Sequence, residues 1–224
     1  MKVIIFGATG MVGQGVLLEC VRDPAISHVL CIGRSPAPNG DAKVAQLVLT
    51  NPGDLSGAAA EVSGYDACFF CLGVSAAGMS EERYRALTFD LTTGAARTLA
   101  ERNTAMTFIY VSGVGTDSTE QGRVMWARVK GATENALLKL PFKAAYMFRP
   151  GVIAPVHGVT SRTPLYRTFY AIAGPLVPLL RKLFPNQVTT TERIGRAMII
   201  AAQRGAPKPI LEPPDIEALV KSTA

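Results

Sequence analysis

The sequence has few of the residues and patterns that several classes of protein require. It contains only two histidines, and Cys20 and Cys31 lack metal-ligand spacing, so we expect no metal site. Its net charge of +6 comes from scattered Lys and Arg without a basic run, which argues against a nucleic-acid partner. No apolar run reaches the roughly 18 residues of a membrane span, and the chain opens without a signal-peptide pattern. We therefore expect a cytoplasmic protein with no integral membrane segment.

The four cysteines form no redox motif. Cys68 and Cys71 have C-x-x-C spacing, but they lie in an apolar run typical of a buried strand. Positions i and i+3 of a strand point to opposite faces, so these two thiols cannot converge. Redox pairs of this spacing open a helix instead. We interpret all four as core thiols, with Cys20 and Cys31 in a predicted helix and strand.

Apolar strands alternate with helical patterns along the first two thirds of the chain. This alternation predicts an α/β fold, a doubly wound parallel sheet with helices on both faces. The expected strands are Lys2–Phe6, His28–Gly33, Lys43–Leu49, Ala67–Leu72, Thr107–Ser112 and Ala144–Phe148. The expected helices are Met11–Arg22, Leu55–Val62, Ser80–Arg102 and Gly122–Leu138.

The first predicted strand leads directly into a glycine-rich turn and then into a helix. Gly7 allows the tight turn, Gly10 lets the backbone approach a pyrophosphate, and Gly13 lets the helix pack close to the sheet. The spacing is G-x-x-G-x-x-G, and an ordinary glycine-rich turn is the alternative. Because this layout places a pyrophosphate at a helix N-terminus, a dinucleotide is the leading ligand. The expected contacts are Gly7, Thr9, Gly10, Met11, Val12 and Gly13.

The second predicted strand ends without the acidic residue that an NAD-selective site places there. Arg34 follows it instead, and could pair with a 2′-phosphate, while Ser35 could add a hydroxyl. We therefore predict that NADP(H) is preferred over NAD(H); a surface arginine is the alternative. The turn after the fourth strand should border the same cofactor, because ligands lie at the carboxyl ends of such strands. Its residues are Cys71, Leu72, Gly73 and Val74.

The fifth predicted strand ends at Ser112, and Trp126 and Lys130 follow on one helix face. With this constellation, the chain resembles the atypical, extended short-chain dehydrogenase/reductases. Within them it is most similar to the small NAD(P)-binding, epimerase-like oxidoreductases related to the human Tat-interactive protein. The resemblance covers nearly the whole chain and rests on Gly7–Gly13, Cys71–Gly73, Val111-Ser112, Val129–Gly131 and Phe148–Gly151.

The resemblance implies a Rossmann fold and roles for individual residues. In this family the Ser orients the substrate carbonyl, a Tyr exchanges the proton, and the Lys binds the nicotinamide ribose and lowers the Tyr pKa. Ser112 and Lys130 match the Ser and the Lys. The Arg-Pro-Gly turn of the family lies beside the nicotinamide. The contacts that this adds are Val111, Pro150, Gly151 and Val152.

The position of the catalytic Tyr is occupied by Trp126, so the predicted catalytic residues are Ser112, Lys130 and Trp126. An indole N–H donates a hydrogen bond but is no practical acid. Another group could supply the proton, solvent could do so, or the protein could bind cofactor without turnover. The candidate donors are Lys130, Ser112 through a water, Tyr84, Tyr110 and His157. Asp117 and Glu120 are interpreted as loop-surface carboxylates.

The chain is expected to form one domain overall, with an NAD(P)-binding core over residues 1–150 and a dependent, substrate-side subdomain over residues 151–224. Gly151–Pro164 is predicted as loop, Thr191–Arg204 as a helix with a Thr-rich cap, and Pro209–Leu211 as a last strand. The apolar stretch Leu165–Phe184 is interpreted as a lid or subunit contact, with a membrane-surface contact as the alternative.

Two functions remain open from the sequence. The first is an NADP(H)-dependent oxidoreductase acting on a small carbonyl-type substrate; the second is a non-catalytic NADP(H)-binding regulator or redox sensor. The resemblance also implies a possible homodimer, paired through the helices Ser80–Arg102 and Gly122–Leu138.

Overall fold

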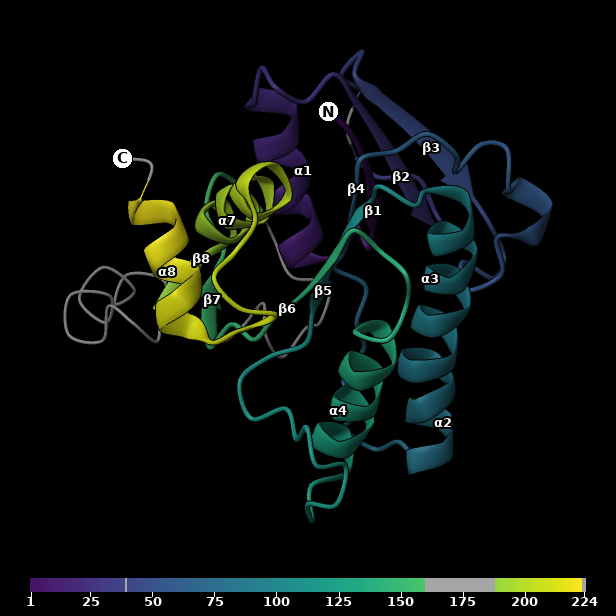
Figure 1. Cartoon of the computed structure of the whole chain (residues 1–224), viewed down its shortest axis with the longest axis vertical. Coiled ribbons are helices and arrows are strands. Elements are labelled where there is room, and N and C mark those ends of the chain that lie inside the picture. Colours follow the sequence, from purple (N-terminus) through teal and green to yellow (C-terminus); the bar gives the residue numbers. More distant parts are fainter. Residues whose placement is uncertain (39, 160–187, 223–224) are drawn as a thin grey trace.

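The computed structural model describes residues 1–38, 40–159 and 188–222. Seven strands form one parallel sheet in the order β3-β2-β1-β4-β5-β6-β9 (Figure 1). The first six have the strand order of a Rossmann sheet, so the predicted fold class is confirmed. The strands are β1 (Lys2–Phe6), β2 (His28–Gly33), β3 (Val44–Val48), β4 (Ala67–Phe70), β5 (Thr107–Val111), β6 (Ala144–Phe148) and β9 (Ile210–Leu211).

Helices cover both faces of this sheet (Figure 1). One face carries α1 (Met11–Arg22), α7 (Thr191–Arg204) and α8 (Pro213–Lys221). The other carries α2 (Glu81–Arg85), the π-helical segment η2 (Ala86–Asp90), α3 (Leu91–Arg102) and α4 (Met125–Leu137). Strand side chains alternate between two hydrophobic cores, because successive positions of a strand face opposite sides.

Helices α1 and α7 pack closely because both present glycine at their contact. A Cβ on Gly15 would lie 2.4 Å from the Cβ of Thr191, and one on Gly195 would lie 3.2 Å from the Cα of Val16. The chain therefore brings its C-terminal part back against the helix that follows the glycine-rich turn.

Two predicted helices differ from the structure. Leu55–Val62 forms only the 3₁₀ turn η1 (Ser56–Ala58), where Asp54 Oδ1 accepts hydrogen bonds from the Ser56 N–H and hydroxyl. Such a local side-chain bond competes with helix formation. Ser80–Arg102 does begin at the predicted cap, since Ser80 Oγ accepts from the Arg83 N–H, but η2 interrupts it.

The C-terminal part contains elements that the sequence did not predict. Residues 152–154 were expected as loop, but β7 (Val152–Ala154) pairs in parallel with β8 (Val188–Thr190). Thr190 caps α7 as expected, accepting from the Arg193 N–H. Helix α8 was missed; a capping box between Glu212 and Asp215 opens it. The stretch Leu165–Phe184 lies outside the described residues. In the described part, no helix combines the length and apolarity needed to cross a membrane.

Candidate functional site

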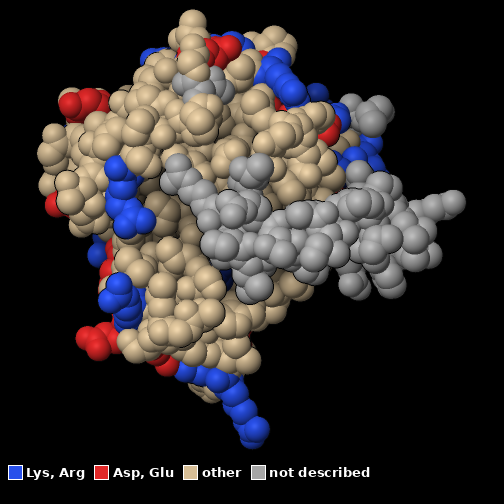
Figure 2. Space-filling model, turned by 180° about the vertical axis from the view of Figure 1, so that it is seen from behind, with Lys and Arg blue, Asp and Glu red and all other residues tan. Residues whose placement is uncertain are grey.

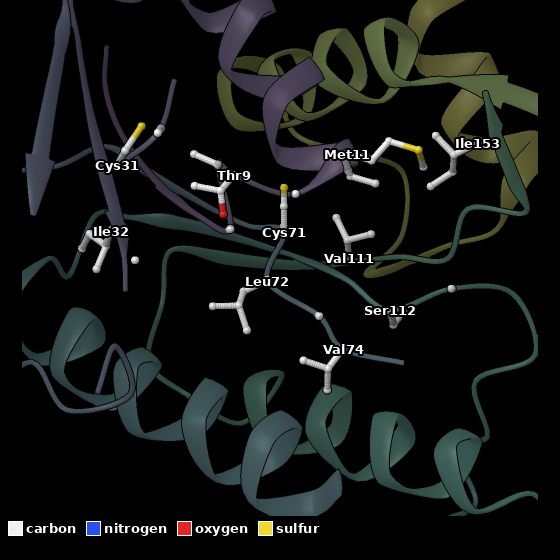
Figure 3. A pocket seen from close by; sticks show the side chains of 18 of the residues that line it. Thr9, Met11, Cys31, Ile32, Cys71, Leu72, Val74, Val111, Ser112 and Ile153 are labelled. Carbon is white, nitrogen blue, oxygen red and sulfur yellow. The ribbon is translucent and has the colours of Figure 1, made fainter. Parts of the chain in front are cut away.

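A cavity of about 520 Å³ opens at the carboxyl ends of β1, β2, β4 and β5. This is where the strand order reverses, between β1 and β4, the usual ligand position in open α/β sheets. In Figure 3 the side chains of Met11, at the start of α1, and Ile153, on β7, point toward one another. The predicted site residues on its wall are Gly7, Thr9, Gly10, Met11, Val12, Arg34, Ser35, Cys71, Leu72, Gly73, Val74, Val111, Ser112, Lys130, Pro150 and Gly151.

The close approach of the glycine-rich turn to neighbouring backbone shapes the first wall of the cavity. Gly7 has φ +78°, and a Cβ there would lie 2.7 Å from the Cα of Leu72. A Cβ on Gly13 would lie 2.1 Å from the carbonyl oxygen of Gly7. Gly13 is not on the cavity wall, and its absent side chain instead lets α1 start directly above β1. Sequence reasoning missed the neighbouring wall residues Ala8, Cys31, Ile32, Gly33, Ala37, Gly113 and Ile153.

The first turn of α1 is suited to an anion. Gly10 is its N-cap without a side-chain acceptor, and no acidic residue lies in that turn. Thr9, Gly10, Met11 and Val12 all line the cavity. The backbone N–H groups and the positive end of the helix dipole therefore face the cavity without a competing carboxylate, which fits a pyrophosphate.

Arg34 and Ser35 lie at the rim of the cavity, directly after β2, and both are exposed. Arg34 makes no ion pair with any described residue. On the face drawn in Figure 2, Lys and Arg are spread over several separate places, some of them next to Asp and Glu. A free guanidinium at this rim can pair with a phosphate.

The opposite wall carries Ser112 and Lys130. Lys130 Nζ donates a hydrogen bond to the carbonyl oxygen of Ser112. Burial lowers the pKa of Lys130 to about 8, and the nearby carboxylate of Glu134 acts in the opposite direction. The Ser112 hydroxyl is 2.5 Å from Glu134 Oε1 and 3.1 Å from the carbonyl oxygen of Phe148. Its single hydrogen already has acceptors inside the protein, so donating to a substrate carbonyl requires one of these bonds to break.

Sequence reasoning missed Glu134 and the side chain of Arg149. Glu134 is fully buried and forms an ion pair with Arg149, which is itself buried. Glu134 lies one helical turn after Lys130, a spacing that places both on one face of α4. This spacing is the one sequence signal that could have placed Glu134 near the site.

Besides Gly13, two predicted residues are absent from the cavity wall as the structure describes it. Trp126 lies in the first turn of α4, half-buried, where its ring faces Gly115: a Cβ on that glycine would lie 3.4 Å from Trp126 Cη2. Val152 is 49% exposed, and Ile153 lines the cavity in its place, because neighbouring strand residues face opposite sides.

The alternative proton donors lie away from the cavity wall. Tyr84 and Tyr110 are buried, and burial raises the pKa of both. His157 Nε2 is 3.2 Å from Glu192 Oε2, and His157 lines a separate small hollow beside α1. Among the named candidates, only Lys130 and Ser112 border the cavity.

The carboxylates of Asp117 and Glu120 form hydrogen bonds within the loop before α4 and between this loop and α4. Asp117 accepts hydrogen bonds from Thr119 and from the Gly122 N–H, and these bonds lower the pKa of Asp117. Glu120 accepts from the Asn135 side chain. Neither lines the cavity, in agreement with their interpretation as loop-surface residues.

The four cysteines are free thiols. Cys68 belongs to the core beneath α3 and α4, whereas Cys71 packs against the core on the other side of the sheet, so the expected divergence is confirmed. Burial raises the pKa of every one of them, which keeps them protonated at neutral pH. Within the described residues, no group of His, Cys, Asp and Glu could hold a metal ion.

No family model and no curated protein match this chain. Solved structures do. A short-chain dehydrogenase family protein from Francisella tularensis is 12% identical, with a TM-score of 0.65 over 91% of each chain. WbmF from Bordetella bronchiseptica, solved with NAD⁺, is 12% identical with a TM-score of 0.65, covering 99% of this chain and 77% of WbmF. MoeE5, solved with UDP-glucose and NAD, is 12% identical with a TM-score of 0.66, covering 100% of this chain and 82% of MoeE5.

The chain has the short-chain dehydrogenase/reductase fold. At identities this low, structural similarity establishes only the fold. The reaction has to be inferred from the residues of the site. The narrower resemblance to the Tat-interactive-protein oxidoreductases stays a prediction.

Proposed function

We propose that the protein is an NADP(H)-dependent oxidoreductase that acts on a small carbonyl-type substrate. The supporting observation is that one cavity, at the reversal of strand order, is lined by the start of α1, by Arg34 and by Lys130. Two proteins of the same fold, WbmF and MoeE5, were solved with NAD⁺ or NAD. The cofactor proposal is thus supported by a glycine-rich turn at a helix N-terminus, by an arginine at the rim that pairs with no described carboxylate, and by a lysine on the opposite wall.

In this proposal the residues of the first wall hold the cofactor. The backbone N–H groups of the first turn of α1 bind the pyrophosphate, and Arg34 pairs with the 2′-phosphate, assisted by the Ser35 hydroxyl. The turn from Cys71 to Val74 and the turn at Pro150 and Gly151 enclose the rest of the cofactor. When bound, NADPH supplies the hydride.

The residues of the second wall orient the reactants and hold the proton. Lys130 binds the nicotinamide ribose, and Ser112 helps to orient the substrate. We favour Lys130 as the proton source for two reasons. Its ammonium group lines the cavity, and its pKa of about 8 is close to neutral pH, as a general acid requires. Trp126 would then shape the site from the start of α4.

The second candidate function is an NADP(H)-binding redox sensor without turnover. It is favoured by Trp126 at the position of the family Tyr and by the absence of any Tyr among the described residues of the cavity wall. A sensor must bind NADPH and NADP⁺ with different affinities, because equal affinity shifts no equilibrium. Equal dissociation constants would remove this candidate, and carbonyl-dependent NADPH consumption would favour the enzyme.

The cofactor preference can be tested by titrating the protein with NADPH and NADH and following the nicotinamide fluorescence. We expect NADPH to bind at least about tenfold more tightly, a difference near 1.4 kcal/mol. Arg34→Ala should remove most of this preference, whereas Arg97→Ala, an exposed arginine of α3, should leave it unchanged. Equal affinities for the two cofactors, or a preference that survives Arg34→Ala, would refute the NADP(H) assignment.

Substitution of Trp126 by Tyr tests the missing phenol. If Trp126→Tyr gains NADPH-dependent reduction of simple carbonyls, the rest of the site is competent and the indole silences it. If Trp126→Tyr loses a measurable native activity, the indole belongs to the working site. The homodimer, the boundary at residue 150 and the cytoplasmic location stay predictions.

A further inference from the structure

A buried ion pair lies behind the cavity wall that carries Ser112 and Lys130. The Glu134 carboxylate accepts hydrogen bonds from Arg149 Nε, at 3.0 Å, and from Arg149 Nη2. The Glu134 side chain is fully buried and that of Arg149 is 10% exposed. Charges this far from water stay ionised only when protein groups replace their hydration, so the pair is held in one geometry.

The same carboxylate reaches the end of β5. Glu134 Oε1 lies 2.5 Å from the hydroxyl of Ser112, and the main-chain carbonyl of Ser112 accepts the hydrogen bond from Lys130 Nζ. Lys130 and Glu134 also share one face of α4, a turn apart. One carboxylate is thereby connected to both polar side chains that this wall presents to the cavity.

Arg149 extends the connection to the neighbouring loops. Pro150 and Gly151, which follow it directly, line the cavity. Arg149 Nη1 donates to Glu212 Oε1 at 3.1 Å, and Nη2 donates to Ser118 Oγ at 2.6 Å. All three nitrogens of the guanidinium are therefore engaged, which leaves the turn after β6 little freedom to move relative to the end of β5.

We propose that Glu134 is a positioning residue of the site: its carboxylate, held by Arg149, fixes the end of β5, and with it the carbonyl group to which Lys130 donates, against the Pro150–Gly151 turn. This inference rests on the proposed function, in which Lys130 binds the nicotinamide ribose. Glu134 itself does not line the cavity and acts through Ser112 and Lys130.

The charges around Lys130 make this role testable. Burial lowers the pKa of Lys130, and the Glu134 carboxylate raises it. Arg149, which directly follows β6, is bound to that carboxylate. Asp117, from the loop before α4, directs its carboxylate to Thr119 and Gly122, so Glu134 is the negative charge that supports the ammonium.

The direct experiment follows the side-chain amine of Lys130 by NMR in cofactor-free protein labelled with ¹³C-lysine. The resonance is assigned with Lys130→Arg, and the pH titration is repeated in Glu134→Gln. We expect the wild-type midpoint near pH 8 and an about tenfold lower proton affinity in Glu134→Gln, since the supporting charge is lost. The matched control is Glu212→Gln, which removes the other carboxylate on Arg149 without touching Ser112. An unchanged midpoint in Glu134→Gln, or an equal shift in Glu212→Gln, overturns the proposal.

A second variant covers the case in which Glu134→Gln does not fold. Glu134→Gln combined with Arg149→Met removes both charges, so no uncompensated ion is left in the core. Its Lys130 midpoint must still fall below that of the wild type; a midpoint equal to the wild type overturns the proposal. The dissociation constant for NADPH, measured against pH, gives an independent readout, because affinity should be lost above each midpoint. If NADPH does not bind the wild type at all, the proposed function fails, while the NMR titration still decides the role of Glu134.

Discussion

The two walls of the cavity differ in what holds them in place: backbone packing in one and charged side chains in the other. The wall around the start of α1 is shaped mainly by backbone: it has tight glycines, a helix N-terminus and no acidic residue in the first turn. The wall around Ser112 and Lys130 is held by charged side chains from α4, from the turn after β6 and from the N-cap of α8. Backbone dipoles do not titrate, whereas the second wall depends on protonation states. One wall should therefore tolerate changes of pH and the other should not.

The largest expected effect comes from breaking the charged wall. Glu134→Ala should lower the free energy of unfolding by about 3–5 kcal/mol, because Arg149 is left buried without its partner. The exposed pair between Glu81 and Arg128, at 2.6 Å, provides the control. Glu81→Ala should cost less than about 1 kcal/mol, since water screens that pair. Urea unfolding measures both, and equal losses would contradict the distinction.

A second test uses the pH dependence of the charged wall. The folded-state pKa of Lys130, about 8, lies below its ordinary value of 10.5, so the unfolded chain binds more protons between these two values. Stability contributed at this position therefore rises with pH across that window, by up to about 3 kcal/mol. Lys130→Met should be more stable than the wild type at pH 7, with the difference shrinking toward pH 10.5. A constant difference across this range would show that burial does not depress the pKa.

The backbone wall is tested by adding a single methyl group. Gly13→Ala places a Cβ 2.1 Å from the Gly7 carbonyl oxygen, so α1 must shift; we expect a loss of about 1–3 kcal/mol and weaker NADPH binding. Gly73→Ala is the control, because no atom of the described residues lies within 4 Å of its added Cβ although Gly73 lines the same cavity. Thermal unfolding should separate the two variants, and similar melting temperatures would contradict the close packing.

The smallest effect is expected at Trp126. Its ring lies against Gly115, and it is not among the described residues of the cavity wall. Trp126→Phe should change the dissociation constant for NADPH by less than about twofold, or roughly 0.4 kcal/mol. Fluorescence titration with NADPH measures this, and a tenfold loss would place the indole against the cofactor.

The sequence predicted the backbone wall and the central sheet well, for a physical reason. Strands buried on both faces are continuously apolar, and a close approach such as that at Gly13 admits only glycine, so both leave local signals. The switch from Val152 to Ile153 on the cavity was missed because a three-residue strand is too short to show its alternation.

The charged wall could not be predicted in the same way. Glu134 lies on α4 and Arg149 directly follows β6, and no sequence pattern near either residue indicates that the two form an ion pair. Glu212 is further away still, in the N-cap of α8, a helix that the sequence did not reveal. Pairings of this kind are set by the tertiary fold, which brings distant residues together only after the sheet has formed.

The contact between α1 and α7 has a consequence for how the protein is made. Val16 and Leu17 of α1 share a buried core with Ile194 and Met198 of α7, which the ribosome adds long after α1. Until α7 emerges, the apolar face of α1 lacks this cover and is available to chaperones or to other nascent chains. Contacts this distant in sequence also slow folding. The apolar face of α1 is thus covered only after a helix much later in the chain has been made.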